Sequence, residues 1–336
     1  MCPWTACEPN RRPVLGATPS LAGPGLVRAL WARSCGAALF IVLVLAPLLA
    51  PAVARAQDVW TPLVRRLASD GFDRGRMEAL FARPEVRFDP QVMARKMNVL
   101  LDVKLSGERP KAEAPEIYVG YLNPYLLMQA RIFLETQKSA LHEVRSRFDV
   151  PEEILVAVLL VETKLGRNVG NKGALATLAS MALAGDFALV APYIEPRDIP
   201  PRLALWLRWR TAQKSAWAYK ELKALLIYAR NAGFDPASIP GSVYGAIGLC
   251  QFMPTNAVRY GADLDGDGRV DLFNPADALL STARFLKANG WAAHLSREGQ
   301  LAVLYRYNHS HPYTRTIMAV ADRLRDAQTD GFSGSD

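Results

Sequence analysis

A run of eight apolar residues from Ile154 to Val161, ILVAVLLV, constrains the fold of this chain more than any other part of its sequence. Pro151 precedes the run at a position typical of the first turn of a helix, and Gly166 follows at a position typical of a helix end. A helix that is apolar on every side cannot face water and belongs in a core. The sequence therefore predicts a central buried helix between Pro151 and Gly166.

Glu162 is the first ionisable residue after this apolar run. Transfer of a carboxylate out of water raises its pKa, and a carboxylic acid that is neutral near pH 7 can donate a proton. Glycoside cleavage needs such a donor, because the departing sugar oxygen must be protonated as its bond breaks. The alternative is that Glu162 points to solvent, or pairs with Lys164 or Arg167, and has no chemical role. The helix by itself leaves both interpretations open.

The chain after residue 56 reads as mainly α-helical, because apolar residues recur at helical spacing and no strict alternation lasts long enough to predict a strand. A polar stretch at 106–115 is expected to be a loop. Three tryptophans, Trp206, Trp209 and Trp217, have near-helical spacing and are expected to anchor the core, although the floor of a sugar groove is the alternative. Beside the central helix, the predicted helices are Asp73–Ala82, Asp89–Leu101, Pro124–Phe148, Leu203–Ala232, Pro275–Ala288 and His311–Ala327.

Residues 1–56 have the features of a leader with a secretory signal. Arg28 and Arg33 precede an uncharged stretch at 36–54, and the motif Ala-Arg-Ala at 54–56 supplies the small residues preferred at a cleavage site. The alternative is an uncleaved membrane anchor, because the uncharged stretch is nearly long enough to span a bilayer. Cys250 is the one cysteine after the leader, which excludes an intrachain disulfide from the mature chain.

The formal net charge of +8 overstates the basicity of the chain after the leader, because the leader holds five arginines against the single Glu8. The smaller surplus that remains, with no block of Lys and Arg, argues against nucleic-acid binding. It suits loose attraction to an anionic polymer such as a cell wall.

Six blocks of sequence follow one another along the chain: VPEEILVAVLLVETKLGR, ALATLASMA, GSVYGAIGLCQFMPTN, DLDGDGRVDLFNPADA, FLKANGW and YRYNHS. In this order they resemble the family of membrane-bound lytic murein transglycosylase B, within the lysozyme-like superfamily. A seventh, GFDRGRMEALF, resembles the N-terminal helical part of that family. The resemblance implies a lysozyme-like catalytic domain at 124–330, preceded by an additional helical region at 57–123.

The resemblance also implies roles for individual residues. Glu162 matches the single catalytic acid and base of the family, and Ser242 and Gln251 match positions that contact the glycan or the catalytic carboxylate. A tyrosine–asparagine pair and a later tyrosine match donors near the glutamate; these are Tyr307, Asn308 and Tyr313. For Tyr313 above all, the alternative is a buried polar side chain satisfied by the backbone.

No second acidic residue stands in a comparably apolar segment, whereas an ordinary glycosidase needs two carboxylates. A transglycosylase needs one, because the C6 hydroxyl of muramic acid attacks its own anomeric carbon and closes a 1,6-anhydro ring. The resemblance, which this count of carboxylates supports, implies a periplasmic enzyme that cuts the β-1,4 bond between N-acetylmuramic acid and N-acetylglucosamine in peptidoglycan strands. Cell-wall synthesis or secretion machinery is a possible further partner. The alternatives are a hydrolytic lysozyme-type muramidase and a wall-binding scaffold without activity.

An acidic loop from residue 263 to 277 resembles the calcium-binding loop of an EF-hand. Asp263, Asp265, Asp267 and the carbonyl of Arg269 occupy ligand positions 1, 3, 5 and 7 of that motif. The twelfth position is not the usual glutamate, and the resemblance implies that Asp277, three residues later, closes the site. We expect one structural Ca²⁺ here and no cofactor for catalysis.

Overall fold

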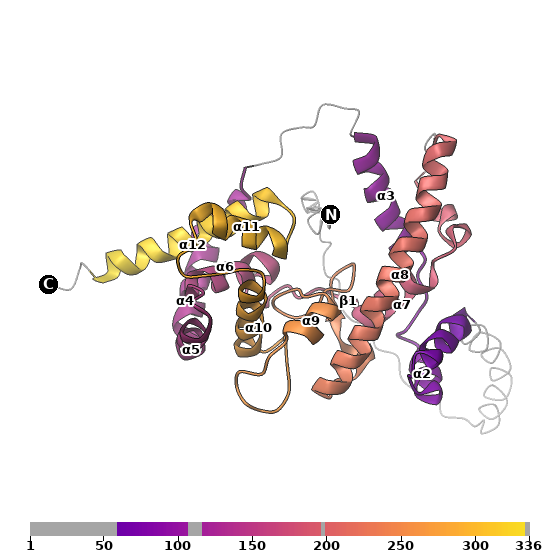
Figure 1. Ribbon diagram of the computed structural model, residues 1–336, viewed down its shortest axis with the longest axis horizontal. Coiled ribbons are helices and arrows are strands. Elements are labelled where there is room, and N and C mark those ends of the chain that lie inside the picture. The colour runs from indigo at the N-terminus through magenta and orange to yellow at the C-terminus, as the bar shows by residue number, and fades with distance from the viewer. Residues whose placement is uncertain (1–58, 107–115, 196–198, 333–336) are drawn as a thin grey trace, which may run out of the picture.

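The computed structural model describes residues 59–106, 116–195 and 199–332 of the chain, with side chains as far as residue 326 (Figure 1). The predicted leader at 1–56 and nearly all of the polar loop predicted at 106–115 lie outside these residues. Within them, no helix is both long and apolar enough to cross a membrane.

The described residues are almost entirely helical, which confirms the mainly α prediction. A first helix covers residues 59–69. Two short strands, Lys172–Gly173 and Pro240–Gly241, pair in antiparallel fashion, with Gly173 opposite Pro240. In chain order, the remaining elements are α2 (Arg74–Phe81), α3 (Gln91–Ser106), η1 (Val119–Leu122), α4 (Pro124–Thr136), α5 (Lys138–Phe148), α6 (Glu152–Thr163), β1 (Lys172–Gly173), α7 (Ala174–Leu183), η2 (Phe187–Leu189), η3 (Ala191–Tyr193), α8 (Pro201–Ala232), η4 (Pro236–Ser238), β2 (Pro240–Gly241), α9 (Pro254–Tyr260), α10 (Pro275–Ala288), α11 (Arg297–Tyr307) and α12 (His311–Phe332).

Helix α6 is the predicted central helix, and every residue from Glu153 to Val161 is buried. It packs against α12, α4, α5 and α10, so it is covered on several sides by other helices. The helix ends at Thr163, earlier than the predicted stop at Gly166, because Lys164 and Leu165 both adopt left-handed backbone conformations. Their N–H groups bond to the carbonyls of the last turn of the helix, which closes the helix end without a glycine.

Other boundaries also differ from the prediction. The segment Pro124–Phe148 forms two helices rather than one, because Gln137 leaves the helical conformation, with φ −106° and ψ 15°. No proline or glycine marks this break, so the sequence carries no signal for it. The first helix and helices α7, α9 and α11 were not among the predicted helices, and the last three are each short.

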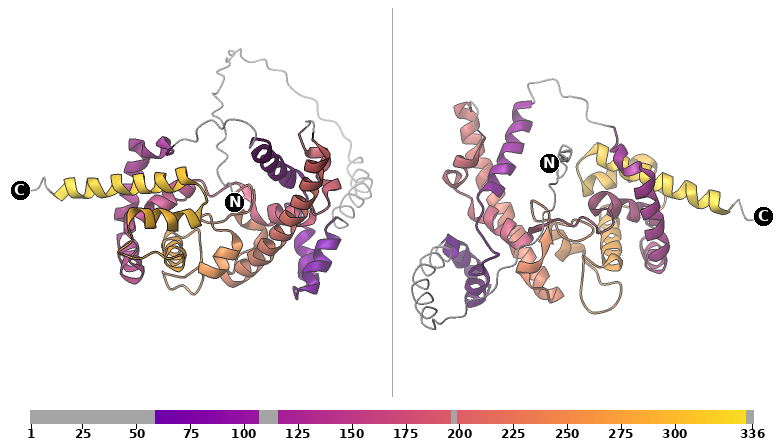
Figure 2. Two further views of the ribbon diagram at one scale, coloured as in Figure 1. Left: turned by 45° about the horizontal axis from the view of Figure 1, so that its top comes forward. Right: turned by 180° about the vertical axis from the view of Figure 1, so that it is seen from behind.

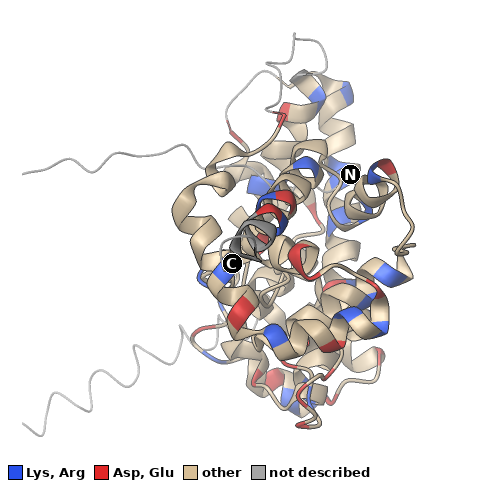
Figure 3. Ribbon diagram, turned by 90° about the vertical axis from the view of Figure 1, so that its left-hand side faces the viewer, with Lys and Arg blue, Asp and Glu red and all other residues tan. Residues whose placement is uncertain are grey.

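Two groups of helices face each other across α9 (Figures 1 and 2). Helices α4, α5, α6, α10, α11 and α12 form one group, and α3, α7 and α8 form the other. Helix α3 belongs to the predicted N-terminal region, yet it packs on α7 and α8 of the predicted catalytic domain. Figure 3, which views the side carrying α12, shows residues of both charge signs interspersed, so neither sign dominates this side.

The spacing of the three tryptophans of α8 predicts that all three anchor the core, but only two of them are partly buried. The buried stripe of this helix passes through Leu203, Leu207 and later positions four residues apart. Trp209 lies away from that stripe and is 55% exposed, so the expectation is wrong for this residue. Trp206 and Trp217 lie beside the stripe and are partly buried against the core.

Gly170 permits the close approach of two backbone segments beside the β1–β2 pair. Its φ is +98°, and a Cβ atom placed on it would lie 2.1 Å from the carbonyl oxygen of Gly241. Gly71 has a similar φ of +91°, but nothing lies within 4 Å of the equivalent Cβ position. An alanine at either position would therefore carry backbone strain, but only an alanine at position 170 would also overlap with neighbouring atoms.

We predict that Gly170→Ala lowers the free energy of unfolding by roughly 2 kcal/mol more than Gly71→Ala does, because both variants carry strain but only the first adds a clash with backbone. Urea denaturation followed by circular dichroism measures both values. Equal losses in the two variants would show that the contact between Gly170 and Gly241 relaxes without cost.

Candidate active site

A cavity of about 850 Å³ opens where the end of α6 meets η1, the segment before α9, and the junction between α11 and α12. All six predicted catalytic and substrate-binding residues line it, although they come from three distant parts of the chain. These residues are Glu162, Ser242, Gln251, Tyr307, Asn308 and Tyr313.

Glu162 is the one carboxylate among the described residues that line this cavity. Its Oε1 atom accepts a hydrogen bond of 2.6 Å from the hydroxyl of Tyr313. Burial raises the pKa of Glu162 to about 7, and the hydrogen bond from Tyr313 opposes part of this rise. In the described structure neither Lys164 nor Arg167 forms an ion pair with this carboxylate. Glu162 is thus a carboxylic acid poised to exchange a proton near neutral pH.

The two tyrosines of the site have different partners. Tyr313 is 1% exposed and donates to Glu162, so it is not a buried phenol satisfied by backbone. Tyr307 instead donates to the carbonyl of Cys250 at 2.6 Å. The two rings stack with centroids 6.4 Å apart. Burial raises the pKa of both phenols well above 10, so both remain donors at any physiological pH.

Asn308 is the residue that ends α11, and its side chain is nearly buried, with 5% exposed. Its Oδ1 atom has no hydrogen-bond partner in the described structure. A buried polar atom without a partner costs free energy, and a ligand that donates an N–H or O–H here recovers it. The amide of Asn308 is therefore placed to accept a hydrogen bond from a molecule in the cavity.

The glycine-rich segment before α9 is held in place by side-chain hydrogen bonds to the backbone. The Oγ atom of Ser242 accepts from the N–H groups of Tyr244 and Ala246, which fixes a tight turn in the cavity wall. Gln251 has a φ of +47°, and its Nε2 atom donates to the carbonyls of Val169 and Gly248. These bonds leave the hydroxyl hydrogen of Ser242 and the amide oxygen of Gln251 to contact a ligand.

Thr163 joins this segment to the end of α6. Its Oγ1 atom donates to the carbonyl of Leu249 at 2.9 Å and accepts from the N–H of Gly166 at 3.0 Å. Because Thr163 directly follows Glu162, the same turn fixes the carboxylate and the opposite cavity wall relative to each other.

Several cavity residues were not singled out from the sequence. Residues 117–121, in and beside η1, form one wall, although they lie in the region predicted as N-terminal to the catalytic domain. Asn256 and Arg306 also line the cavity. Phe252 also lines the cavity, but it is 2% exposed and packs among Tyr260, Phe285 and Tyr307. No spacing or composition signal marks η1 as part of the site.

Three of the predicted calcium ligands lie together in the acidic loop, whereas Asp277 is not part of their group. Ligand atoms of Asp263, Asp265 and Asp267 all lie within 4.8 Å of one another. Asp277 is 1% exposed, and its two oxygens accept from the N–H groups of Leu264 and Asp271, each at 2.7 Å. Burial raises the pKa of Asp277, and repulsion from Asp265 and Asp263 adds to the rise. Oxygen donors concentrated in this way match the preference of Ca²⁺.

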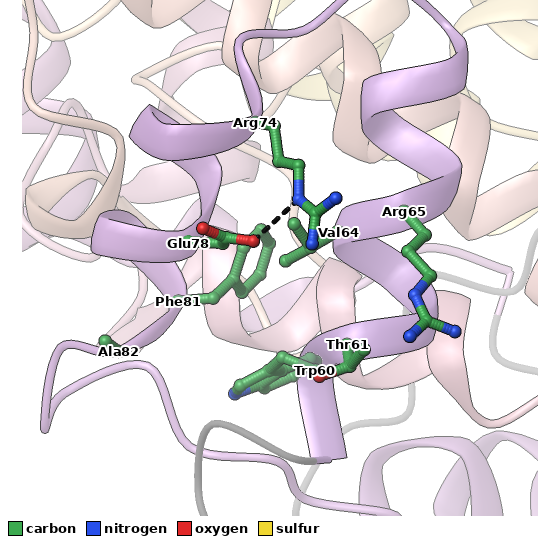
Figure 4. A pocket seen from close by; sticks show the side chains of 8 residues that line it. All are labelled: Trp60, Thr61, Val64, Arg65, Arg74, Glu78, Phe81 and Ala82. Carbon is green, nitrogen blue, oxygen red and sulfur yellow. Dashed lines mark hydrogen bonds and ion pairs between the residues drawn. The ribbon is translucent and has the colours of Figure 1, made fainter. Parts of the chain in front are cut away.

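A second cavity, of about 260 Å³, lies between the first helix and α2 (Figure 4). An ion pair of 2.8 Å between Arg74 and Glu78 crosses it above the rings of Trp60 and Phe81. Its one carboxylate is thus already paired, and none of the predicted site residues lies there, so we assign the active site to the larger cavity.

Comparison with known proteins identifies the family of this chain. Residues 55–301 match the model of the transglycosylase SLT domain. The chain belongs to this family. It is 30% identical over 171 residues to membrane-bound lytic murein transglycosylase B of Escherichia coli K12, an alignment that covers 51% of this chain and 40% of that relative. The chain therefore matches less than half the length of this curated relative.

Two solved structures share the fold. SltB3 from Pseudomonas aeruginosa in complex with NAG-NAM-pentapeptide superposes with a TM-score of 0.59 at 22% identity, covering 80% of each chain. A lytic transglycosylase of Escherichia coli in complex with calcium superposes with a TM-score of 0.57 at 20% identity, covering 83% of this chain and 94% of that one. The family resemblance and the lysozyme-like helical fold expected from the sequence are both confirmed.

We predict that Tyr313→Phe raises the pKa of Glu162 further above 7, by about one unit, because the lost hydrogen bond had favoured the charged carboxylate while burial remains unopposed. The carboxyl carbon of Glu162, followed by ¹³C NMR against pH, reports this value. The matched control is Tyr307→Phe, whose lost hydroxyl bonds to Cys250 and not to the carboxylate. A pKa that falls or stays constant in Tyr313→Phe would contradict the prediction.

Proposed function

We propose that this chain is a periplasmic lytic transglycosylase that cuts the β-1,4 bond between N-acetylmuramic acid and N-acetylglucosamine in peptidoglycan. The observation that carries the proposal is the isolation of Glu162. It is the one carboxylate among the described cavity-lining residues, and its pKa is raised to about 7. A hydrolase that retains or inverts configuration normally requires a second carboxylate.

In the proposed reaction, protonated Glu162 gives its proton to the glycosidic oxygen as the bond to the muramic anomeric carbon breaks. The C6 hydroxyl of the same muramic residue then attacks that carbon, and the Glu162 carboxylate takes the hydroxyl proton. The products are a 1,6-anhydro-muramoyl end and a free 4-hydroxyl on the leaving sugar, and Glu162 returns to its protonated form. A pKa near the working pH suits a group that acts as acid and then as base.

The other residues support this chemistry by position. Tyr313 orients the carboxylate and limits the rise of its pKa. We assign Asn308, with its unpartnered Oδ1, to the N–H of a substrate N-acetyl group. Ser242 and Gln251 are assigned to the sugar hydroxyls along the wall, and Tyr307 to support of the backbone at Cys250. The SltB3 complex with NAG-NAM-pentapeptide supports a glycan strand as the ligand.

We predict that the purified protein releases 1,6-anhydro-muropeptides from sacculi, with no new reducing muramic ends. The two products differ by one water, so mass spectrometry of the digest distinguishes them. Glu162→Gln should lower the rate by about a thousandfold or more, because the amide cannot donate the proton. A melting temperature close to that of the wild type would show that this variant is folded.

Other outcomes would favour the alternative functions. Reducing muramic ends would mean that water reaches the anomeric carbon, and the muramidase would replace the transglycosylase. Sacculi that bind the wild-type protein but remain uncut would favour the wall-binding scaffold.

The acidic loop is proposed to hold one structural Ca²⁺ through Asp263, Asp265, Asp267, the Arg269 carbonyl and Asp277. The three clustered carboxylates and the calcium complex of the Escherichia coli relative support this assignment. The ion would offset repulsion among these groups and take no part in the reaction. It would also brace the loop that leads into α10.

We predict that 1 mM Ca²⁺ raises the unfolding temperature by a few degrees relative to excess chelator, because an ion that binds only the folded state stabilises it by mass action. Differential scanning calorimetry measures the shift, and Asp265→Asn should reduce it. Mg²⁺ at the same concentration is the control, because its smaller octahedral shell suits this site less well. Equal unfolding temperatures with calcium and with chelator would refute the site.

Secretion through the N-terminal signal, or retention by an uncleaved anchor, would bring the protein to this substrate. The Escherichia coli relative is named as membrane-bound. Cell fractionation and N-terminal sequencing of the mature protein would decide between the two routes.

A further inference from the structure

The first part of α8 carries positive charge that the proposed reaction does not use. Residues 201–220 contain no aspartate or glutamate, and Glu221 is the first acidic residue of the helix. None of the described residues that line the active-site cavity belongs to α8. The basic residues of this stretch are Arg202, Arg208, Arg210, Lys214 and Lys220. An anionic partner outside the cavity is the natural counterpart of such a stretch.

The outer side of this part of α8 is apolar along its centre. Leu205 is 68% exposed and Trp209 is 55% exposed. Ala212 and Ala216, which are also exposed, continue the same line, because steps of four, three and four residues stay on one side of an α-helix. The line from Leu205 to Ala216 is about 17 Å long. The opposite side of the helix is the buried stripe that packs into the core.

Basic residues flank this apolar line on both sides. Arg202 and Arg208 lie about 60° from Leu205 around the helix, in opposite directions. Both are exposed. No ion pair joins Arg208 to a carboxylate of the described residues, so its charge is left for an outside partner.

A further arginine lies against the exposed tryptophan. The guanidinium of Arg210 lies 5.6 Å from the centre of the Trp209 ring and 6.0 Å from that of Trp206, and it donates to the amide oxygen of Gln213 at 2.7 Å. The attraction between cation and indole limits the rotation of Trp209. Tryptophan with arginine beside it is typical of helices at the boundary between water and lipid, where one end of the surface is apolar and the other is wet.

This surface lies on a different side of the molecule from the C-terminal helix. In Figure 1 the first part of α8 forms the upper right edge beside α3, and α12 lies on the left. Figure 2 shows the same separation from two other directions. A contact along the outer side of α8 therefore involves none of the described residues that line the cavity.

We propose that this side of α8 docks the protein on a bilayer that contains anionic phospholipids. An apolar centre with cationic edges is the pattern of a helix that lies in a membrane interface, with its apolar side chains at the acyl boundary and its arginines at the phosphate groups. A glycan-binding surface would need groups that bond sugar hydroxyls, and the centre of this line offers none. The residues of this surface, called the α8 face, are Arg202, Leu205, Arg208, Trp209, Ala212 and Ala216.

The experiment measures the partition of the purified protein onto vesicles by sedimentation. Neutral vesicles contain phosphatidylcholine alone, and in anionic vesicles about one third of the lipid is phosphatidylglycerol. We expect partition onto anionic vesicles to be about tenfold stronger, because each basic residue near an anionic surface contributes about fivefold. This difference should shrink at high salt, which screens the charges.

Three variants separate the contributions of charge and apolar contact. Arg208→Gln should lower partition onto anionic vesicles by about fivefold and leave partition onto neutral vesicles unchanged. Trp209→Ser should lower partition onto both kinds of vesicle. Arg230→Gln, a change at an exposed arginine in the last turn of α8, removes the same charge outside the α8 face and is the matched control. All variants share one N-terminus, so any binding by the leader is common to them.

A local measurement shows whether Trp209 itself meets lipid. Bromine atoms on the acyl chains quench the fluorescence of tryptophans that contact them. Trp209→Phe keeps an aromatic ring at this position, so it should retain most of the binding and lose the share of quenching that belongs to Trp209. Equal quenching in the wild type and in Trp209→Phe would overturn the proposal.

Two further results would also overturn it. One is equal partition of the wild type, Arg208→Gln and Trp209→Ser onto anionic vesicles. The other is binding to lipid-free sacculi that weakens in these variants while vesicles bind none of them, which would assign the α8 face to an anionic glycan. Cleavage of soluble glycan strands should be the same in all of these variants, so the proposed function is tested separately from membrane docking.

Discussion

The site depends on the burial of α6, because this burial sets both the position and the pKa of Glu162. An uninterrupted apolar surface from Ile154 to Val161 fixes the helix among four neighbours. Its last turn then brings the partly buried carboxylate of Glu162 to the cavity wall. Without that surrounding core, Glu162 would be an ordinary surface acid, ionised at neutral pH and unable to protonate a leaving group.

The end of α6 also shows where the fold accepts strain. Lys164, Leu165 and, across the cavity, Gln251 all have positive φ values, although none is glycine. Such conformations cost free energy and persist where surrounding contacts enforce them. Here the enforcing contacts are the bond from Thr163 to the Leu249 carbonyl and the bonds from Gln251 to Val169 and Gly248. The chain accepts this strain where it turns sharply after Glu162 and where it closes the wall opposite it.

The sequence predicts the parts of this structure that depend on local chemistry. The all-apolar run predicts the central helix, and Asp73 predicts the start of α2 because its side chain caps the first turn. It does not predict the break at Gln137 or the contribution of η1 to the cavity, since both depend on packing between distant segments. The family resemblance groups the site residues, whereas the hydrogen-bond partner of each residue is seen only in the structure. Tyr307 and Tyr313 look equivalent in the sequence, yet one supports a backbone carbonyl and the other donates to Glu162.

The hydrogen-bond partner of Glu162 is a phenol and not a second carboxylate. A second carboxylate at this distance would repel the first and push its pKa higher, and it would also bring in a group able to activate water. A buried tyrosine donates one hydrogen bond, adds no charge and remains protonated because burial raises its own pKa. Burial and the phenol therefore act in opposite directions on Glu162, and the balance leaves its pKa near 7. A pKa near 7 suits the role proposed for this one group, which is to give a proton to the glycosidic oxygen and then take one from the sugar hydroxyl.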